Sequence, residues 1–171
     1  QPIISDGIIA TEKDLDAYKF RPNSAIGIYL AHRSVWEKAA SGDEKYTLIL
    51  EDDTSPNEKL IGKQFDDVIA SKLHQDFGIL KLHNDYSAIF NGMYSAAAYI
   101  ITKKTAKKLL NTYTVILGHV DIDMYIICKI NSIKIIINED LFDTDENEST
   151  NTMNTGKSLY SYIMDSYGST S

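Results

Sequence analysis

The sequence has a single cysteine and no apolar run long enough to cross a membrane. One thiol, Cys128, cannot form an internal disulfide, and no CxxC pair or Cys/His zinc spacing is present. We expect Cys128 to be a small buried side chain. Because a bilayer span needs roughly 20 consecutive apolar residues, we expect a soluble, cytoplasmic protein without a membrane span.

Basic residues are also in the minority. The sequence has 17 Lys and Arg against 24 Asp and Glu, so its formal net charge is −7. A protein that binds duplex nucleic acid or an anionic membrane surface needs a concentrated basic face. The charge balance therefore predicts no nucleic-acid partner.

The chain does have enough apolar residues for one core, with 43% apolar types in 171 residues. Helical and strand-like hydrophobic periods alternate along it, which is typical of an α/β domain. We place this domain at residues 1–142. From residue 143 onward Ser, Thr and Asn dominate, so residues 143–171 are expected to be a polar C-terminal tail.

The expected elements follow from these periods and from turn signals. Helices are predicted over Ser24–Ala40, 58–73, Lys103–Tyr113 and Val120–Ile130. Strands are predicted over Tyr46–Leu50, Phe77–Leu82, the end of 94–102 and Ile133–Ile137, with a loop at Thr54–Asn57. Thr102 is expected to cap the helix that follows it. The near-continuous apolar strands favour a mixed, mostly parallel sheet flanked by helices.

The strongest chemical signal is a buried strand that ends in three acids, Glu51, Asp52 and Asp53. Ligand sites of α/β sheets lie beyond the carboxyl ends of strands. Alternate side chains share a face, so Glu51 and Asp53 are placed together and Asp52 apart. Oxygen ligands without His or Cys favour Mn²⁺ or Mg²⁺. A solvated acidic turn is the alternative explanation of the same residues.

Four segments, in order, resemble glycosyltransferase family 25, which includes lipooligosaccharide and collagen galactosyltransferases. They are a helix with a His and a downstream Trp (Gly27–Ala39), a strand ending in Leu-Glu-Asp-Asp (Leu48–Asp53), an Ala-Tyr strand with a Leu-Leu helix (Ala97–Leu110), and Val120–Asp123. Two positions depart from the pattern: Ala31 stands where the family usually has Ser, and Ile28 where it often has Cys. The N-terminal strand typical of the family is not recognisable.

The resemblance implies a GT-A-type, Rossmann-like nucleotide-sugar-binding domain. It implies transfer of a hexose from a nucleoside-diphosphate sugar, such as a UDP-sugar, to a glycan or another hydroxyl-bearing acceptor, with Mn²⁺ or Mg²⁺ at Glu51 and Asp53. An inverting reaction needs a carboxylate base, for which Asp121 is the first candidate and Asp123 the second. An N-cap of the following helix explains Asp121 equally well.

Three further residues are assigned to the donor site: Asp52, His32 and Trp36. A hydrogen-bonded core position explains His32 as well, and plain core packing explains Trp36 as well. Two other functions stay open. A non-catalytic relative would bind a glycan or a partner without transferring sugar, and a metal-dependent phosphohydrolase would need a second set of ligands around two metals.

Overall fold

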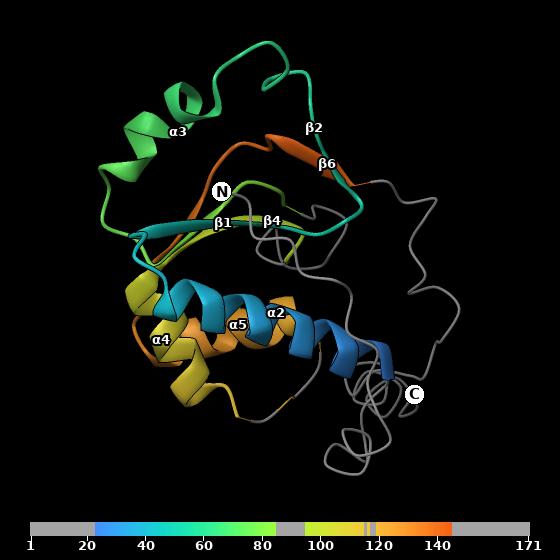
Figure 1. Cartoon of the computed structure of the whole chain (residues 1–171), viewed down its shortest axis with the longest axis vertical. Coiled ribbons are helices and arrows are strands. Elements are labelled where there is room, and N and C mark those ends of the chain that lie inside the picture. Colours follow the sequence, from blue (N-terminus) through green and yellow to red (C-terminus); the bar gives the residue numbers. More distant parts are fainter. Residues whose placement is uncertain (1–22, 85–94, 115, 117–118, 145–171) are drawn as a thin grey trace, which may run out of the picture.

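The computed structural model describes residues 23–84, 95–114, 116 and 119–144 (Figure 1). These residues form an α/β structure with a mixed four-stranded sheet flanked by helices. The strand order is β1-β4-β3-β5. The strands are β1 (Tyr46–Leu50), β3 (Ile79–Lys81), β4 (Ala98–Thr102) and β5 (Ile135–Ile137). The predicted α/β class and mixed sheet are confirmed.

The expectation of a mostly parallel sheet is wrong for the described strands. Strand β4 pairs antiparallel with both β1 and β3, and only β3 and β5 pair in parallel. An apolar run indicates that a strand is buried on both faces of the sheet, as β4 is, but it does not indicate the direction of the strand. As a consequence, the carboxyl ends of β1, β3 and β5 lie at the same sheet edge as the amino end of β4.

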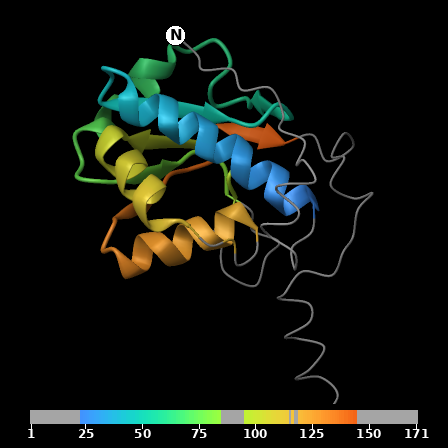
Figure 2. The ribbon, with the colours of Figure 1, turned by 60° about the horizontal axis from the view of Figure 1, so that its bottom comes forward.

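Three helices cover one face of this sheet: α2 (Asn23–Ser41), α4 (Lys103–Thr112) and α5 (Val120–Ile130) (Figures 1 and 2). Helix α2 buries a stripe at three- and four-residue spacing, the pattern of an amphipathic helix. The stripe consists of Ala25, Ile26, Tyr29, His32, Val35, Trp36, Ala39 and Ala40. It packs on Ile49, Ile79, Tyr99 and Ile101, the side chains that alternate strand positions direct to this face.

The opposite face packs against α3 (Phe65–Leu73) and the segment around a small second sheet. That sheet pairs β2 (Thr54–Pro56) with β6 (Phe142–Thr144) in antiparallel register. Two ring contacts lie in the core on this face, with centroids 5.5 Å apart for Tyr46 and Phe77 and 6.3 Å apart for Phe65 and Phe142. The sheet therefore has an apolar core on each side.

The predicted helices and strands recur near their expected places. Thr102 is the N-cap of α4, where its side chain accepts a hydrogen bond from the Thr105 amide at 3.2 Å. Cys128 is fully buried, as predicted.

Three segments differ from expectation. The predicted loop at Thr54–Asn57 contains β2, because its backbone groups pair with β6. The helix expected over 58–73 begins only at Phe65, after turns on Asn57 and a positive φ of 75° at Gly62. Strand β6 includes the first two residues of the expected polar tail, and the rest of that tail lies outside the described residues.

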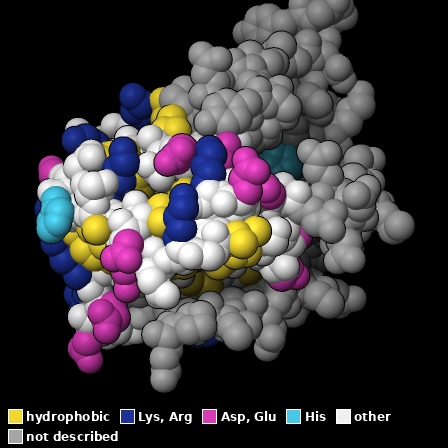
Figure 3. Space-filling model, turned by 90° about the horizontal axis from the view of Figure 1, so that it is seen from above, with side chains coloured by type: hydrophobic (Ala, Val, Ile, Leu, Met, Phe, Trp, Pro, Cys, Tyr) yellow, Lys and Arg dark blue, Asp and Glu magenta, His cyan; other side chains and the backbone are white. Residues whose placement is uncertain are grey.

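No helix in the described ranges is both long and apolar enough to cross a membrane. On the face drawn in Figure 3, acidic and basic side chains are interspersed, with no continuous basic area among the coloured residues.

Candidate functional site

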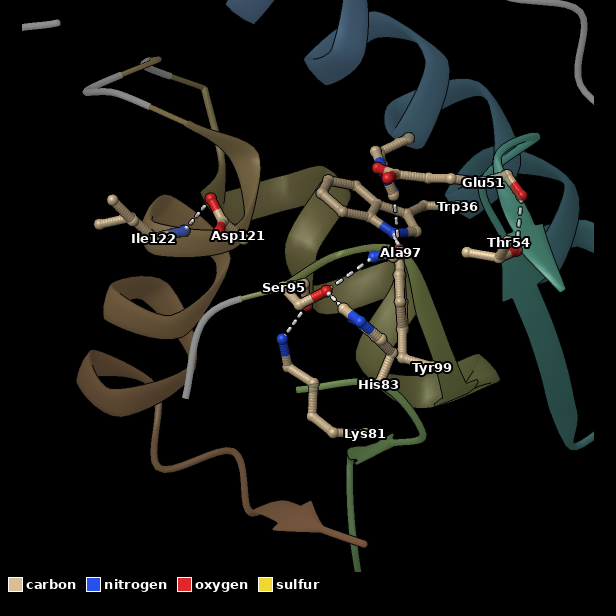
Figure 4. A network of polar contacts seen from close by, with 11 residues as sticks. Trp36, Glu51, Thr54, Lys81, His83, Ser95, Ala97, Tyr99, Asp121 and Ile122 are labelled. Carbon is tan, nitrogen blue, oxygen red and sulfur yellow. Dashed lines mark hydrogen bonds and ion pairs between the residues drawn. The ribbon is translucent and has the colours of Figure 1, made fainter. Parts of the chain in front are cut away.

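Polar side chains gather where the three parallel-running strands end. Glu51 follows β1, Lys81 ends β3, Ser95 precedes β4, and Asp121 lies in the first turn of α5 (Figure 4). The backbone joins two of these ends, because the Glu51 amide donates to the Ala97 carbonyl at 2.8 Å. The sheet edge thus brings together residues that are far apart in the sequence.

A chain of hydrogen bonds leads from Glu51 into the helix-covered core. Nε2 of His32 lies 3.2 Å from Oε1 of Glu51, and Nδ1 of His32 lies 2.8 Å from the Tyr99 hydroxyl. The same hydroxyl accepts a bond from Nε1 of Trp36 at 2.9 Å. His32 and Trp36 are 5% and 0% exposed, whereas the Glu51 side chain is 34% exposed. Of these residues, Glu51 is therefore the one that a ligand can reach.

This arrangement locates two of the residues assigned to donor binding. Trp36 has no exposed surface, so any influence on a ligand passes through Tyr99 and the packing of the core. His32 touches Glu51 and contributes to the site from behind it. Asp52, the third such residue, is exposed to solvent.

Asp53 is the acid whose surroundings leave an oxygen without a partner. Its Oδ1 is buried and accepts no hydrogen bond within the described part of the chain. Burial raises the pKa of the Asp53 carboxyl, and the neighbouring charge of Glu51 raises it further. Both effects disfavour an isolated carboxylate here. A bound cation would reverse them, because it would attract both carboxylates.

The fit to a divalent ion rests on Glu51 and Asp53. No group of three or more His, Cys, Asp and Glu side chains within the described ranges is arranged to hold a metal. Two carboxylates are nevertheless a common protein contribution to a Mg²⁺ site, where water and substrate phosphates complete the coordination. Among the described residues, no Lys or Arg forms an ion pair with either acid. Within the described ranges, the side-chain partner of the Glu51 carboxylate is therefore the imidazole of His32 rather than a Lys or Arg.

The two candidate bases lie in different environments. Asp123 is 1% exposed and accepts a hydrogen bond from the Tyr113 hydroxyl at 2.7 Å. Asp121 is half-buried, and its Oδ1 accepts a bond from the Ile122 amide at 2.8 Å. The N-cap of α5 is His119, so Asp121 is not the cap. Of the pair, Asp121 has the surface that a general base requires.

Sequence reasoning missed Tyr99, Lys81, His83 and Ser95. Lys81 is 1% exposed, and its ammonium donates to the Ser95 carbonyl. Nδ1 of His83 lies 2.7 Å from Oγ of Ser95. A lysine inside the apolar strand Phe77–Leu82 was the available signal, since buried lysines are rare without a partner. Tyr99 belongs to the Ala-Tyr strand of the quoted motif, but no role followed from that position. His83 and Ser95 had no comparable signal, because their contact joins residues on either side of a segment outside the described residues.

Lys81 predicts a pH dependence of stability. Burial lowers the pKa of Lys81 from 10.5 to about 8, against the opposing attraction of Asp121, Cys128 and Glu51. Between these values the unfolded chain binds more protons than the folded one, so the free energy of unfolding rises with pH. We expect Lys81 to contribute an increase of about 1 kcal/mol between pH 8 and 9.

Urea unfolding of the wild type and Lys81→Met at several pH values measures this contribution. The interval ends near pH 9 because burial raises the pKa of Cys128 from 9.0 to about 12, which produces the opposite slope at higher pH. Methionine retains much of the volume without the charge. Equal slopes for the two proteins below pH 9 would show that the ammonium is not held in a low-dielectric environment.

No protein-family model matches this chain, and no curated protein matches it at a significant level. The resemblance to glycosyltransferase family 25 thus rests on the quoted motifs alone.

Proposed function

We propose that this chain is a metal-dependent glycosyltransferase domain of the GT-A type. It would transfer a hexose from a nucleoside-diphosphate sugar, with a UDP-sugar as the first candidate, to a hydroxyl group of a glycan or a hydroxylated protein. The observation that carries the proposal is the pair Glu51 and Asp53 after β1, with a buried Asp53 oxygen that has no partner among the described residues. The mixed sheet with helices on its face is compatible with a GT-A fold.

The residues after β1 would bind the cation, and a residue of α5 would act as the base. Glu51 and Asp53 would hold a Mn²⁺ or Mg²⁺ ion, which supplies positive charge to a departing nucleoside diphosphate. Asp121, on α5, would take the proton of the acceptor hydroxyl while the hydroxyl oxygen forms a bond to the anomeric carbon. The bond from that carbon to the diphosphate breaks in the same step, so charge and atoms balance.

The proposal is tested with a panel of nucleoside-diphosphate hexoses, with and without Mn²⁺. Hydrolysis releases the free nucleoside diphosphate even when the acceptor is unknown, so that release is the readout. We expect release for at least one donor with Mn²⁺ and none after chelation. Absence of binding and release for every donor would reject the proposal in favour of the non-catalytic module.

Asp121→Asn separates the base from the metal site. The amide keeps the size of the side chain but cannot accept a proton, so transfer should fall by about 100-fold or more. Binding of Mn²⁺ and the melting temperature should stay close to wild type. The matched variant is Asp76→Asn, which lies in the turn after α3, away from the sheet edge. Full transfer activity in Asp121→Asn would remove this residue from the mechanism.

A further inference from the structure

The donor and the acceptor can be assigned in each hydrogen bond that links Trp36, Tyr99, His32 and Glu51. An indole N–H only donates, so the Tyr99 oxygen is an acceptor for Trp36. An ionised carboxylate only accepts, so Nε2 of His32 carries a hydrogen toward Glu51. In a neutral imidazole the other nitrogen, Nδ1, then accepts, and the Tyr99 hydroxyl is its donor.

The alternative is a doubly protonated His32. Nδ1 would then donate to the Tyr99 oxygen, which already accepts from Trp36. The Tyr99 hydroxyl hydrogen would have to find another acceptor, although the side chain is fully buried. No second acceptor contacts that hydroxyl within the described residues. A buried donor without a partner is costly, so the neutral form with hydrogen on Nε2 satisfies every group.

Strand pairing and ring stacking hold the Tyr99 and His32 side chains in this geometry. Tyr99 pairs with Ile49 and Lys81 in the ladders at the centre of the sheet. Its ring stacks on that of His32, with centroids 5.8 Å apart and planes 19° from parallel. The hydrogen bonds from Trp36 through Tyr99 and His32 therefore connect side chains anchored on α2 and β4 to the half-exposed carboxylate of Glu51.

We propose that Tyr99 is a positioning residue: its hydroxyl donates to Nδ1 of His32 and keeps that nitrogen unprotonated, so that the imidazole is fixed with Nε2–H on Oε1 of Glu51. Glu51 keeps its other oxygen for a ligand. The role assigned to Glu51 as a cation ligand rests on the proposed function, whereas the tautomer does not. Partners that orient metal ligands in this way typically change metal affinity by 10- to 100-fold when they are removed.

Nitrogen-detected NMR of the imidazoles tests the tautomer directly. The His32 signals are assigned by their loss in His32→Gln. We expect wild-type His32 to be protonated on Nε2 and unprotonated on Nδ1. In Tyr99→Phe the donor to Nδ1 is gone, so a population of His32 that carries hydrogen on Nδ1 should appear. A wild-type His32 protonated on Nδ1 alone, or on both nitrogens at neutral pH, would overturn the proposal without any variant.

Trp36→Phe is the matched control, because it removes the other hydrogen bond to the same hydroxyl. It also deletes ring volume, so it should destabilise the fold more than Tyr99→Phe does. The positioning role predicts an unchanged tautomer and Mn²⁺ affinity in Trp36→Phe, against a 10- to 100-fold weaker affinity in Tyr99→Phe. A purely structural role predicts that affinity follows stability, which is the reverse order.

Mn²⁺ affinity is measured by electron paramagnetic resonance on the whole chain. A weaker affinity in Trp36→Phe than in Tyr99→Phe would contradict the positioning role. If the wild type shows the expected tautomer but binds no Mn²⁺, the proposed cation site fails while the effect of Tyr99 on His32 stands. The two proposals can therefore fail separately.

Discussion

Asp53→Asn is expected to abolish Mn²⁺-dependent release of nucleoside diphosphate, with a loss of at least about 100-fold. The Asp53 carboxylate is one of the two proposed cation ligands after β1, and its Oδ1 is buried without a partner in the described structure. The amide is neutral and a weaker ligand. Release of product from a UDP-hexose under saturating donor is the measurement.

The fold should survive this substitution. Burial and the charge of Glu51 raise the pKa of Asp53, so the ionised form lowers stability at neutral pH and its removal does not. Asp67→Asn, on the exposed surface of α3, is the matched control and should retain full activity. Comparable turnover in Asp53→Asn and wild type would show that the acids after β1 do not bind the catalytic ion.

Trp36→Ala is expected to lower the free energy of unfolding by about 3–5 kcal/mol. Trp36 is fully buried between α2 and the sheet, with its ring 5.8 Å from that of Tyr113. Truncation leaves a cavity and deprives the Tyr99 hydroxyl of a donor. Because Trp36 is the only tryptophan, urea unfolding should be followed by circular dichroism rather than by fluorescence.

This variant also decides between packing and donor stacking. If Trp36 acts only in the core, the folded fraction of Trp36→Ala should bind UDP with near wild-type affinity. Ile130→Ala, at a position 76% exposed, is the control and should change stability by no more than about 0.5 kcal/mol. Wild-type stability together with lost UDP binding would instead place the indole against the donor.

The local elements were predictable because each is encoded by neighbouring residues. The stripe of α2, the apolar β1 and the Thr102 cap can be read from three- and four-residue spacing, from run length and from one hydroxyl. Strand direction was not predictable in this way. Strand β4 is buried on both faces whichever way it runs, and only its pairing with β1 and β3 makes it antiparallel.

The site was predictable to the extent that it lies next to a strand end. Glu51 and Asp53 could be singled out because three acids follow an apolar strand. His32 could also be assigned to the site from the sequence, but its contact with Tyr99 could not, since the two residues are 67 positions apart. Asp121 was ranked before Asp123 from the sequence, although nothing in the sequence distinguishes their environments. Their difference is one of burial, which α5 sets by turning Asp123 toward Tyr113.

The central claim is that a divalent ion joins a diphosphate to Glu51 and Asp53. The most direct measurement is the melting temperature of the wild type with UDP alone, Mn²⁺ alone and both together. At 100 times the dissociation constant a ligand adds about 2.7 kcal/mol, which raises the melting temperature of a chain this size by roughly 5–10 °C. We predict the full shift only when UDP and Mn²⁺ are present together, and a smaller one with Mn²⁺ alone. An equal shift with UDP alone, or no shift under any condition, would contradict the claim.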